Sequence, residues 1–425
     1  METRTGSLAR RLGTTDAVAI GLGSMLGAGV FAAFAPAARA AGTGLLVGLV
    51  IAAVIAYCNA TASAQLAAVY PTSGGTYIYG RARLGDWWGF TAGWGFVIGK
   101  TASCAAMALT FAGYAVPGPW WAQRLVAIAG VLAVAALNYR GVTKTAIVTR
   151  ILVAATLATL TVVVVGIASG GGAGISHLGG LSALGHGGVY GVLQAAGLLF
   201  FAFAGYARIA TMGEEVRDPE RTIPRAIPLA LAITVVVYLI VGVAALLAAG
   251  PDQLATAPAP LTHAVRAAGA GSVVPVVRVG AALASLGALL ALIAGVGRTS
   301  LAMSRNHDLP GWLAAVHPRF QVPHRAEAAL AVVVSILVLI VDLRDVIGFS
   351  SVGVLVYYAI TNAAAFTQPA HQRRWPRAGN VLGLAGCAVL VATLPITSII
   401  AGLLMFTAGL LGRLCVLHRY PTPVD

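Results

Sequence analysis

Apolar runs of roughly 20 residues recur along the whole of this 425-residue chain. An α-helix rises about 1.5 Å per residue, so each run is long enough to cross about 30 Å of hydrocarbon. Transmembrane β-strands would appear as runs of about 10 residues with alternating polarity, and that pattern does not occur. Only 9% of the residues are charged, whereas a soluble domain carries about 25%. The sequence therefore predicts an all-α integral membrane protein.

Twelve membrane spans can be placed on these runs. The first run is too long and too often interrupted by glycine for a signal peptide, so it counts as a span. We expect spans at residues 15–41, 43–69, 86–114, 122–138, 146–168, 188–212, 226–249, 275–302, 327–341, 346–366, 379–394 and 396–416.

The order of these spans predicts two five-helix halves followed by two further helices. The first half covers residues 15–169 and the second covers residues 187–366. Because five is an odd number, the halves would cross the membrane in opposite directions and form a 5+5 inverted repeat. Residues 1–14 form an N-terminal tail, and residues 367–425 hold helices 11 and 12 and the C-terminus.

The formal net charge of +14 reports on topology. Most of the 27 Lys and Arg residues fall on one side of the predicted spans, the side that also holds both termini. The positive-inside rule then predicts a multi-pass protein of the cytoplasmic membrane with both termini in the cytoplasm. A nucleic-acid partner would need an exposed basic stripe, and the sequence shows none, so the expected surroundings are the lipid bilayer.

Catalytic chemistry is not expected. The eight histidines fall in loops or near the termini, and the acidic residues fall at or beyond the ends of spans. The four cysteines lie in apolar runs without a CxxC pair, which is typical of small buried side chains. Because no HExxH motif, GxSxG motif or acidic dyad is present, we predict no enzyme activity, no metal and no cofactor.

The stretch GLGSMLGAGVF (21–31) places four glycines in the middle of the first span. Each glycine inside a helix costs about 1 kcal/mol relative to alanine. One interpretation is close helix packing, because Gly23 and Gly27 form a GxxxG pair. The other is a discontinuous helix whose unwound middle offers backbone groups to a substrate. Gly205 lies between aromatic residues in the first span of the second half, which favours the second interpretation.

Five stretches resemble the amino acid–polyamine–organocation (APC) superfamily of permeases over essentially the whole chain. They are GSMLGAGVF in span 1, YPTSGGTYIYGRARLGDWWGFTAGW (70–94), LNYRG (137–141), FFAFAGYARIATMGEEVRDPERTIPRAI (200–227) and SRNHDLP (304–310). The resemblance implies a leucine-transporter-like fold and a secondary transporter that moves amino acids or related amines by alternating access. Its substrate would bind where helices 1 and 6 are unwound.

The resemblance also assigns candidate substrate-binding residues. In helix 1, backbone amides would face the substrate carboxylate at Ser24, Met25, Leu26, Gly27, Ala28 and Gly29. In helix 6, the carbonyls of Phe203, Ala204 and Gly205 would face its amine, and Phe203 and Tyr206 would wall the side-chain pocket. Further lining candidates are Cys104, Ser350 and Ser351.

The coupling ion stays open, with three candidate residues. Proton-coupled relatives carry a lysine in helix 5 where this chain has Thr156, and sodium-coupled relatives use hydroxyls on helix 8, where this chain offers Ser285. Lys100 lies near the middle of span 3, and a buried lysine can change its charge near neutral pH. Its alternative role is a structural hydrogen bond. Arg208 lies one turn from the end of span 6. Its alternative role is structural, with the side chain extending to the membrane–water interface.

Glu214 and Glu215 end span 6 and are candidates for an inner gate. The expected partners of these carboxylates are Arg217 and Arg221, and a solvated polar turn is the alternative interpretation.

The kind of transport also stays open. Because no carboxylate is expected at mid-membrane, neutral or hydrophobic amino acids are favoured over basic amino acids and polyamines. A symporter, an exchanger or antiporter, a polyamine carrier and a non-transporting nutrient sensor are the alternatives, and the oligomeric state is unknown. A channel would need pore-lining polar or charged rings, which the sequence lacks.

Overall fold

The computed structural model describes residues 10–116, 118–178, 187–257, 259–341 and 343–419. Within these ranges the regular structure is helical, apart from one isolated backbone bridge between Leu12 and Val216. The α-helices are α1 (Thr14–Met25), α2 (Ala28–Ala32), α3 (Phe34–Ala41), α4 (Leu45–Val69), α5 (Thr76–Leu84), α6 (Asp86–Ala115), α7 (Trp120–Tyr139), α8 (Val142–Ser169), α9 (Gly188–Phe203), α10 (Ala207–Ala210), α11 (Pro219–Thr256), α12 (Pro260–Ala267), α13 (Val274–Arg305), α14 (His324–Ile340), α15 (Leu343–Phe366), α16 (Arg377–Thr393) and α17 (Ile396–Arg419). Short 3-10 helices are η1 (Gly42–Gly44), η2 (Ile175–Leu178), η4 (Ala204–Tyr206), η5 (Gly271–Val273), η6 (Gly311–Ala314) and η7 (Ala370–Gln372).

Every predicted span corresponds to a helix or to an interrupted helix. In the described ranges, 10 segments are long and apolar enough to cross a membrane. The helices α14 and α16, with 17 residues each, account for the two remaining predicted spans. The first predicted span is divided among α1, α2 and α3, and the sixth among α9, η4 and α10. The all-helical fold predicted from hydropathy is therefore confirmed.

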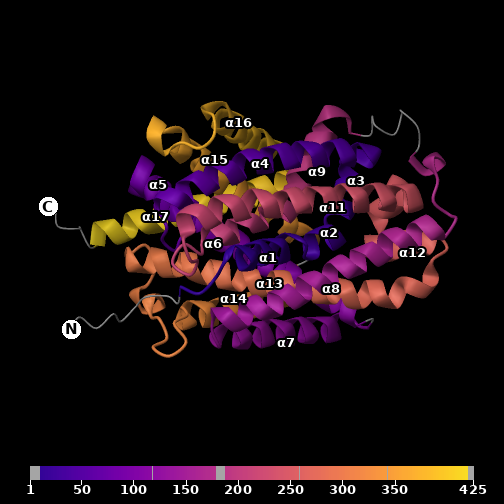
Figure 1. Ribbon diagram of the computed structural model, residues 1–425, viewed down its shortest axis with the longest axis horizontal. Helices are drawn as coiled ribbons and strands as arrows, with labels where there is room; N and C mark the ends of the chain where they lie inside the picture. Colours follow the sequence, from indigo (N-terminus) through magenta and orange to yellow (C-terminus); the bar gives the residue numbers. More distant parts are fainter. Residues whose placement is uncertain (1–9, 117, 179–186, 258, 342, 420–425) are drawn as a thin grey trace.

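The helices form one elongated bundle. Figure 1 shows α1 and α13 in the middle of the bundle, with α7 along one edge and α16 along the opposite edge. The central helix α13 buries a long series of Ala, Gly and Ser residues, which lets neighbouring backbones approach closely. The edge helix α7 instead exposes large apolar side chains, among them Trp120, Trp121 and Leu125. An outward apolar surface of this kind suits a lipid surrounding.

One end of the bundle carries the first described residues and the end of α17, and we call it the terminus-bearing face (Figure 1). The chain before α1 is joined there to the α10–α11 loop by backbone hydrogen bonds. Leu12 N donates to Glu215 O over 3.0 Å, and Arg217 N donates to Leu12 O over 2.8 Å. The segment that directly precedes the first predicted half is therefore attached to the second half.

Asp308 organises a second polar contact on the terminus-bearing face. It accepts a hydrogen bond from the Tyr77 hydroxyl at 2.7 Å and forms ion pairs with Arg81 at 2.9 Å and Arg413 at 3.1 Å. These contacts join α5, the loop after α13, and α17. The SRNHDLP stretch thus holds the last helix of the chain against the core.

Candidate functional site

The glycine run interrupts the first membrane helix. Helix α1 ends at Met25, and α2 begins at Ala28. Between them, Leu26 (φ −75°, ψ 36°) and Gly27 (φ −99°, ψ −140°) leave helical geometry. The last carbonyls of a helix lack intrahelical partners, so the interruption releases backbone acceptors inside the bundle.

The sixth predicted span is interrupted as well. Helix α9 ends at Phe203, and the 3-10 turn η4 (Ala204–Tyr206) connects it to the short helix α10. A change from α to 3-10 geometry in mid-helix often marks a functional hinge. Ala204 and Gly205 are buried, and Tyr206 and Phe203 are fully buried.

The two interruptions lie against each other. A Cβ atom at Gly205 would lie 2.4 Å from the carbonyl carbon of Ser24 and 2.7 Å from the amide nitrogen of Met25. A Cβ atom at Gly29 would lie 2.6 Å from the Cβ of Ala202. Two glycines therefore let the unwound segments of the two helices meet backbone to backbone.

The other glycines of the run bring α1 close to further helices. A Cβ atom at Gly21 would lie 2.5 Å from Ile209 Cδ1, one at Gly23 would lie 2.7 Å from Thr149 Cγ2, and one at Gly27 would lie 2.1 Å from Ala288 Cβ. The packing interpretation and the discontinuous-helix interpretation thus describe the same stretch. The glycines permit close approach, and the helix is interrupted between them.

Tyrosine hydroxyls from flanking helices cap the released carbonyls. Tyr238 of α11 donates to Met25 O at the end of α1 and also lies 3.2 Å from Ala202 O near the end of α9. Tyr358 of α15 donates to Ala204 O over 3.3 Å. The carbonyl end of a helix carries partial negative charge, so these hydroxyls stand where a substrate ammonium group would be attracted.

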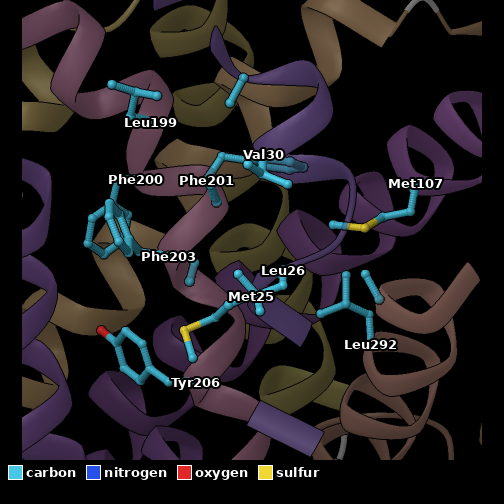
Figure 2. Packing of buried hydrophobic residues seen from close by; sticks show 14 of the residues in the cluster. Met25, Leu26, Val30, Met107, Leu199, Phe200, Phe201, Phe203, Tyr206 and Leu292 are labelled. Carbon is cyan, nitrogen blue, oxygen red and sulfur yellow. The ribbon is translucent and has the colours of Figure 1, made fainter. Parts of the chain in front are cut away.

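Uncharged side chains surround the interruptions. In Figure 2, Met25 and Leu26 lie between Phe203 and Tyr206 on one side and Met107 and Leu292 on the other. All six are buried. Ser24 is buried too, and its hydroxyl donates to Ile20 O of its own helix over 2.8 Å.

The remaining predicted lining residues are buried on α6 and α15. The Ser350 hydroxyl lies 2.6 Å from that of Ser103, so it links α15 to α6. Cys104 follows Ser103 and is fully buried. Ser351 Oγ has no hydrogen-bond partner among the described residues. In the described part of the chain, none of these side chains is hydrogen-bonded to either interruption.

The three coupling candidates have different surroundings. Lys100 is 2% exposed, and its ammonium forms no hydrogen bond or ion pair within the described ranges. Thr156 donates its hydroxyl proton to Leu152 O of its own helix. Arg208 does not extend to the interface, because it is 2% exposed and lies 3.6 Å from Glu215.

A buried charge cluster begins directly after the second interruption, at Arg208 of α10. We define the cluster as Arg208, Glu215, Arg298 and Glu327. Arg298 is its centre, with Nη2 at 2.5 Å and Nε at 2.8 Å from the two oxygens of Glu215. Its Nη1 lies 2.8 Å from Glu327 Oε1. The cluster joins the α10–α11 loop to α13 and α14. Burial raises the pKa of Glu215, but Arg298 and Arg208 outweigh burial and hold that pKa below its ordinary value.

These partners differ from the ones expected for the acidic pair. Glu215 contacts Arg298 and Arg208, and Glu214 contacts Arg305 at 3.2 Å. Arg217 is exposed, and Arg221 lies 3.9 Å from Asp218. The expected pairing with Arg217 and Arg221 was wrong, because the chain folds back so that arginines of α13, distant in sequence, take their place.

Tyr238, Tyr358, Arg298 and Glu327 are the residues near the candidate site that sequence reasoning missed. A signal existed for the charged ones. Arg298 falls inside the predicted span 275–302, and Glu327 begins the predicted span 327–341. A charge of each sign in neighbouring spans is typical of a buried pair. The tyrosines carried no such signal, since a lone aromatic in an apolar run looks like ordinary packing.

Two interrupted helices that meet inside a multi-pass helical bundle are typical of secondary membrane transporters. The chain belongs to the amino acid permease family, whose model matches residues 12–413.

Several relatives are similar to the chain over most of its length. An uncharacterized transporter of Mycobacterium tuberculosis is 60% identical over 95% of this chain and 90% of its own. A branched-chain amino acid permease of Bacillus subtilis is 27% identical over 90% of this chain and 87% of its own. The cationic amino acid transporter 7 (chloroplastic) of Arabidopsis thaliana is 29% identical over 84% of this chain and 65% of its own.

Proposed function

We propose that the protein is an alternating-access carrier that moves amino acids across the cytoplasmic membrane. The observation that carries the proposal is the contact between the two interruptions, where Gly205 lies against Ser24 and Met25. The amides of residues 24–29 would hold the substrate carboxylate, and the carbonyls of residues 203–205 would face its amine. Binding would then use opposite partial charges of two broken helices.

The substrate class we favour is neutral amino acids with apolar side chains. Met25, Leu26, Phe203, Met107 and Leu292 would form an apolar surrounding for the substrate side chain (Figure 2). The segments 17–41 and 188–210 contain no Asp or Glu that would neutralise a second positive charge. Burying an unpaired charge is costly, so basic amino acids and polyamines would bind less well.

The buried charge cluster supports an inner gate. The terminus-bearing face would be cytoplasmic by the positive-inside rule. Opening that face would require the α10–α11 loop to separate from α13, and the ion pairs of Arg298 with Glu215 oppose this separation. A 5+5 inverted repeat of residues 15–169 and 187–366 would provide the two bodies that move relative to each other.

Counterflow of radiolabelled amino acids into proteoliposomes tests this function. We expect saturable uptake of leucine, isoleucine or valine against an excess of the same unlabelled amino acid inside. Uptake of arginine and putrescine should be far weaker. Liposomes without protein are the control.

The same proteoliposomes distinguish symport from exchange. Uptake driven by a pH gradient alone would indicate symport, and uptake only against internal amino acid would indicate exchange. If no amino acid or amine enters saturably, the transporter proposal is wrong, and a non-transporting sensor becomes the favoured function.

Lys100 is proposed as the proton-responsive group. A buried amine without an ion-pair partner is costly while charged, so it is suited to gaining and losing a proton during the cycle. We expect Lys100→Met to flatten the pH dependence of leucine uptake around neutral pH. Thr110→Val, which removes a hydroxyl that bonds within the same helix α6, should keep the wild-type profile. An unchanged profile in Lys100→Met would assign coupling elsewhere.

A further inference from the structure

Tyr238 contacts both broken helices at once. Its hydroxyl donates to Met25 O, the last carbonyl of α1, and lies 3.2 Å from Ala202 O in the last turn of α9. Its ring lies 5.1 Å from that of Phe203, and its hydroxyl is 3.4 Å from the position of a Cβ at Gly29. The side chain is 1% exposed. A residue of a third helix, α11, therefore holds the two interruptions together.

The hydroxyl cannot satisfy both carbonyls. A tyrosine hydroxyl has one proton to donate and lone pairs that accept. When the proton points to Met25 O, Ala202 O receives no hydrogen bond from it, and the lone pairs of the hydroxyl remain acceptors. The hydroxyl oxygen and two carbonyl oxygens thus converge on a single hydroxyl proton. An ammonium group would bring three further donors to these oxygens.

We propose that Tyr238 is a specificity-determining residue that positions the amine of the substrate. The substrate ammonium donates one hydrogen bond to the Tyr238 oxygen and another to the carbonyl that the tyrosine proton leaves without a donor. Hydrogen bonds that involve a charged group are stronger than neutral ones, so the site selects molecules with an amine at this position. The inference rests on the proposed function, because it requires that an amino acid binds at the two interruptions.

Two other buried tyrosines offer a comparison. Tyr114 of α6 donates to Phe31 O of α2 over 3.2 Å, and Tyr358 of α15 donates to Ala204 O over 3.3 Å. Each is bonded to one of the broken helices. Tyr114→Phe is therefore a matched control, since it also removes a buried hydroxyl from a carbonyl of the interrupted first span.

The experiment compares L-leucine with 2-hydroxy-4-methylpentanoate, which keeps the carboxylate and side chain and replaces the ammonium with a hydroxyl. Both compete for radiolabelled leucine counterflow in proteoliposomes. The readout is the ratio of their inhibition constants. We expect the preference for leucine to fall about tenfold or more in Tyr238→Phe, because one charged hydrogen bond is lost. Tyr114→Phe should keep the wild-type ratio.

A merely structural role would lower uptake and thermal stability but leave the ratio unchanged, and that result would overturn the assignment. If Tyr238→Phe does not fold, 3,5-difluorotyrosine incorporated at position 238 keeps the ring and the hydroxyl and makes its oxygen a poorer acceptor. It should also reduce the preference for leucine over the hydroxy acid, and an unchanged preference in this variant would also overturn the assignment. A wild-type protein that transports no amino acid overturns the proposed function itself.

Discussion

Replacing Gly205 with alanine should strongly reduce transport while the protein remains in the membrane. The added methyl group would lie 2.4 Å from the carbonyl carbon of Ser24, 2.5 Å from its oxygen and 2.7 Å from the amide nitrogen of Met25. These are backbone atoms, so they cannot turn aside as a flexible side chain would. Forcing atoms into a filled site costs about 1–3 kcal/mol, and a penalty of that size on the transport-competent state corresponds to a roughly 5- to 150-fold loss of uptake.

Gly113→Ala is the matched control for this change. Gly113 also lies in a helix, α6, and a Cβ there would meet no atom within 4 Å. Uptake of leucine by the two variants should be compared at equal amounts of protein in the membrane. Wild-type uptake by Gly205→Ala would mean that the two interruptions do not have to touch for transport.

Replacing Arg298 with methionine should have the largest effect on stability. Arg298 forms the close ion pairs of both Glu215 and Glu327, and all three side chains are at most 3% exposed. Removing one partner of a buried pair typically costs about 3–5 kcal/mol, because the other charge stays buried without compensation. We expect a marked drop in the melting temperature in detergent and low expression of Arg298→Met.

Two variants separate this effect from a general intolerance of mutation. Arg221→Ala removes an ion pair of 3.9 Å between exposed side chains, and such a pair contributes about 0–1 kcal/mol, so stability should hardly change. Combining Arg298→Met with Glu327→Gln removes the carboxylate whose ion pair is lost, while Glu215 keeps its contact with Arg208. This double variant should regain part of the lost stability. A stable single variant would contradict the central role of Arg298.

The membrane helices could be predicted from sequence because hydrophobic length is a local property. The interruptions at Gly27 and Gly205 were predictable in part, because glycine weakens a helix, although close packing was the other use that glycine has in an apolar run. The contacts across the bundle were not. Glu215 and Arg298 are far apart in the chain, and the sequence favoured the nearer Arg217 as a partner. Which residues meet depends on how helices rotate against one another, and hydropathy in an evenly apolar chain contains little information about that rotation.

Tyr238 illustrates the same limit at the candidate site. In the apolar run of α11 it resembles any packed aromatic residue, and only the fold brings its hydroxyl to Met25 O and Ala202 O. The family resemblance pointed to the backbone of helices 1 and 6, and it did not point to a side chain of the seventh predicted span.

The backbone bridge between Leu12 and the α10–α11 loop has a consequence for biosynthesis. About 200 residues separate the two partners, and a ribosome adding about 5–20 residues per second needs roughly 10 to 40 s to make them. During that time the first span waits in the bilayer without the bridge and without Ile209 and Ala202, against which Gly21 and Gly29 later pack. The nascent first helix therefore depends on segments that are translated after it, and its insertion precedes its final packing.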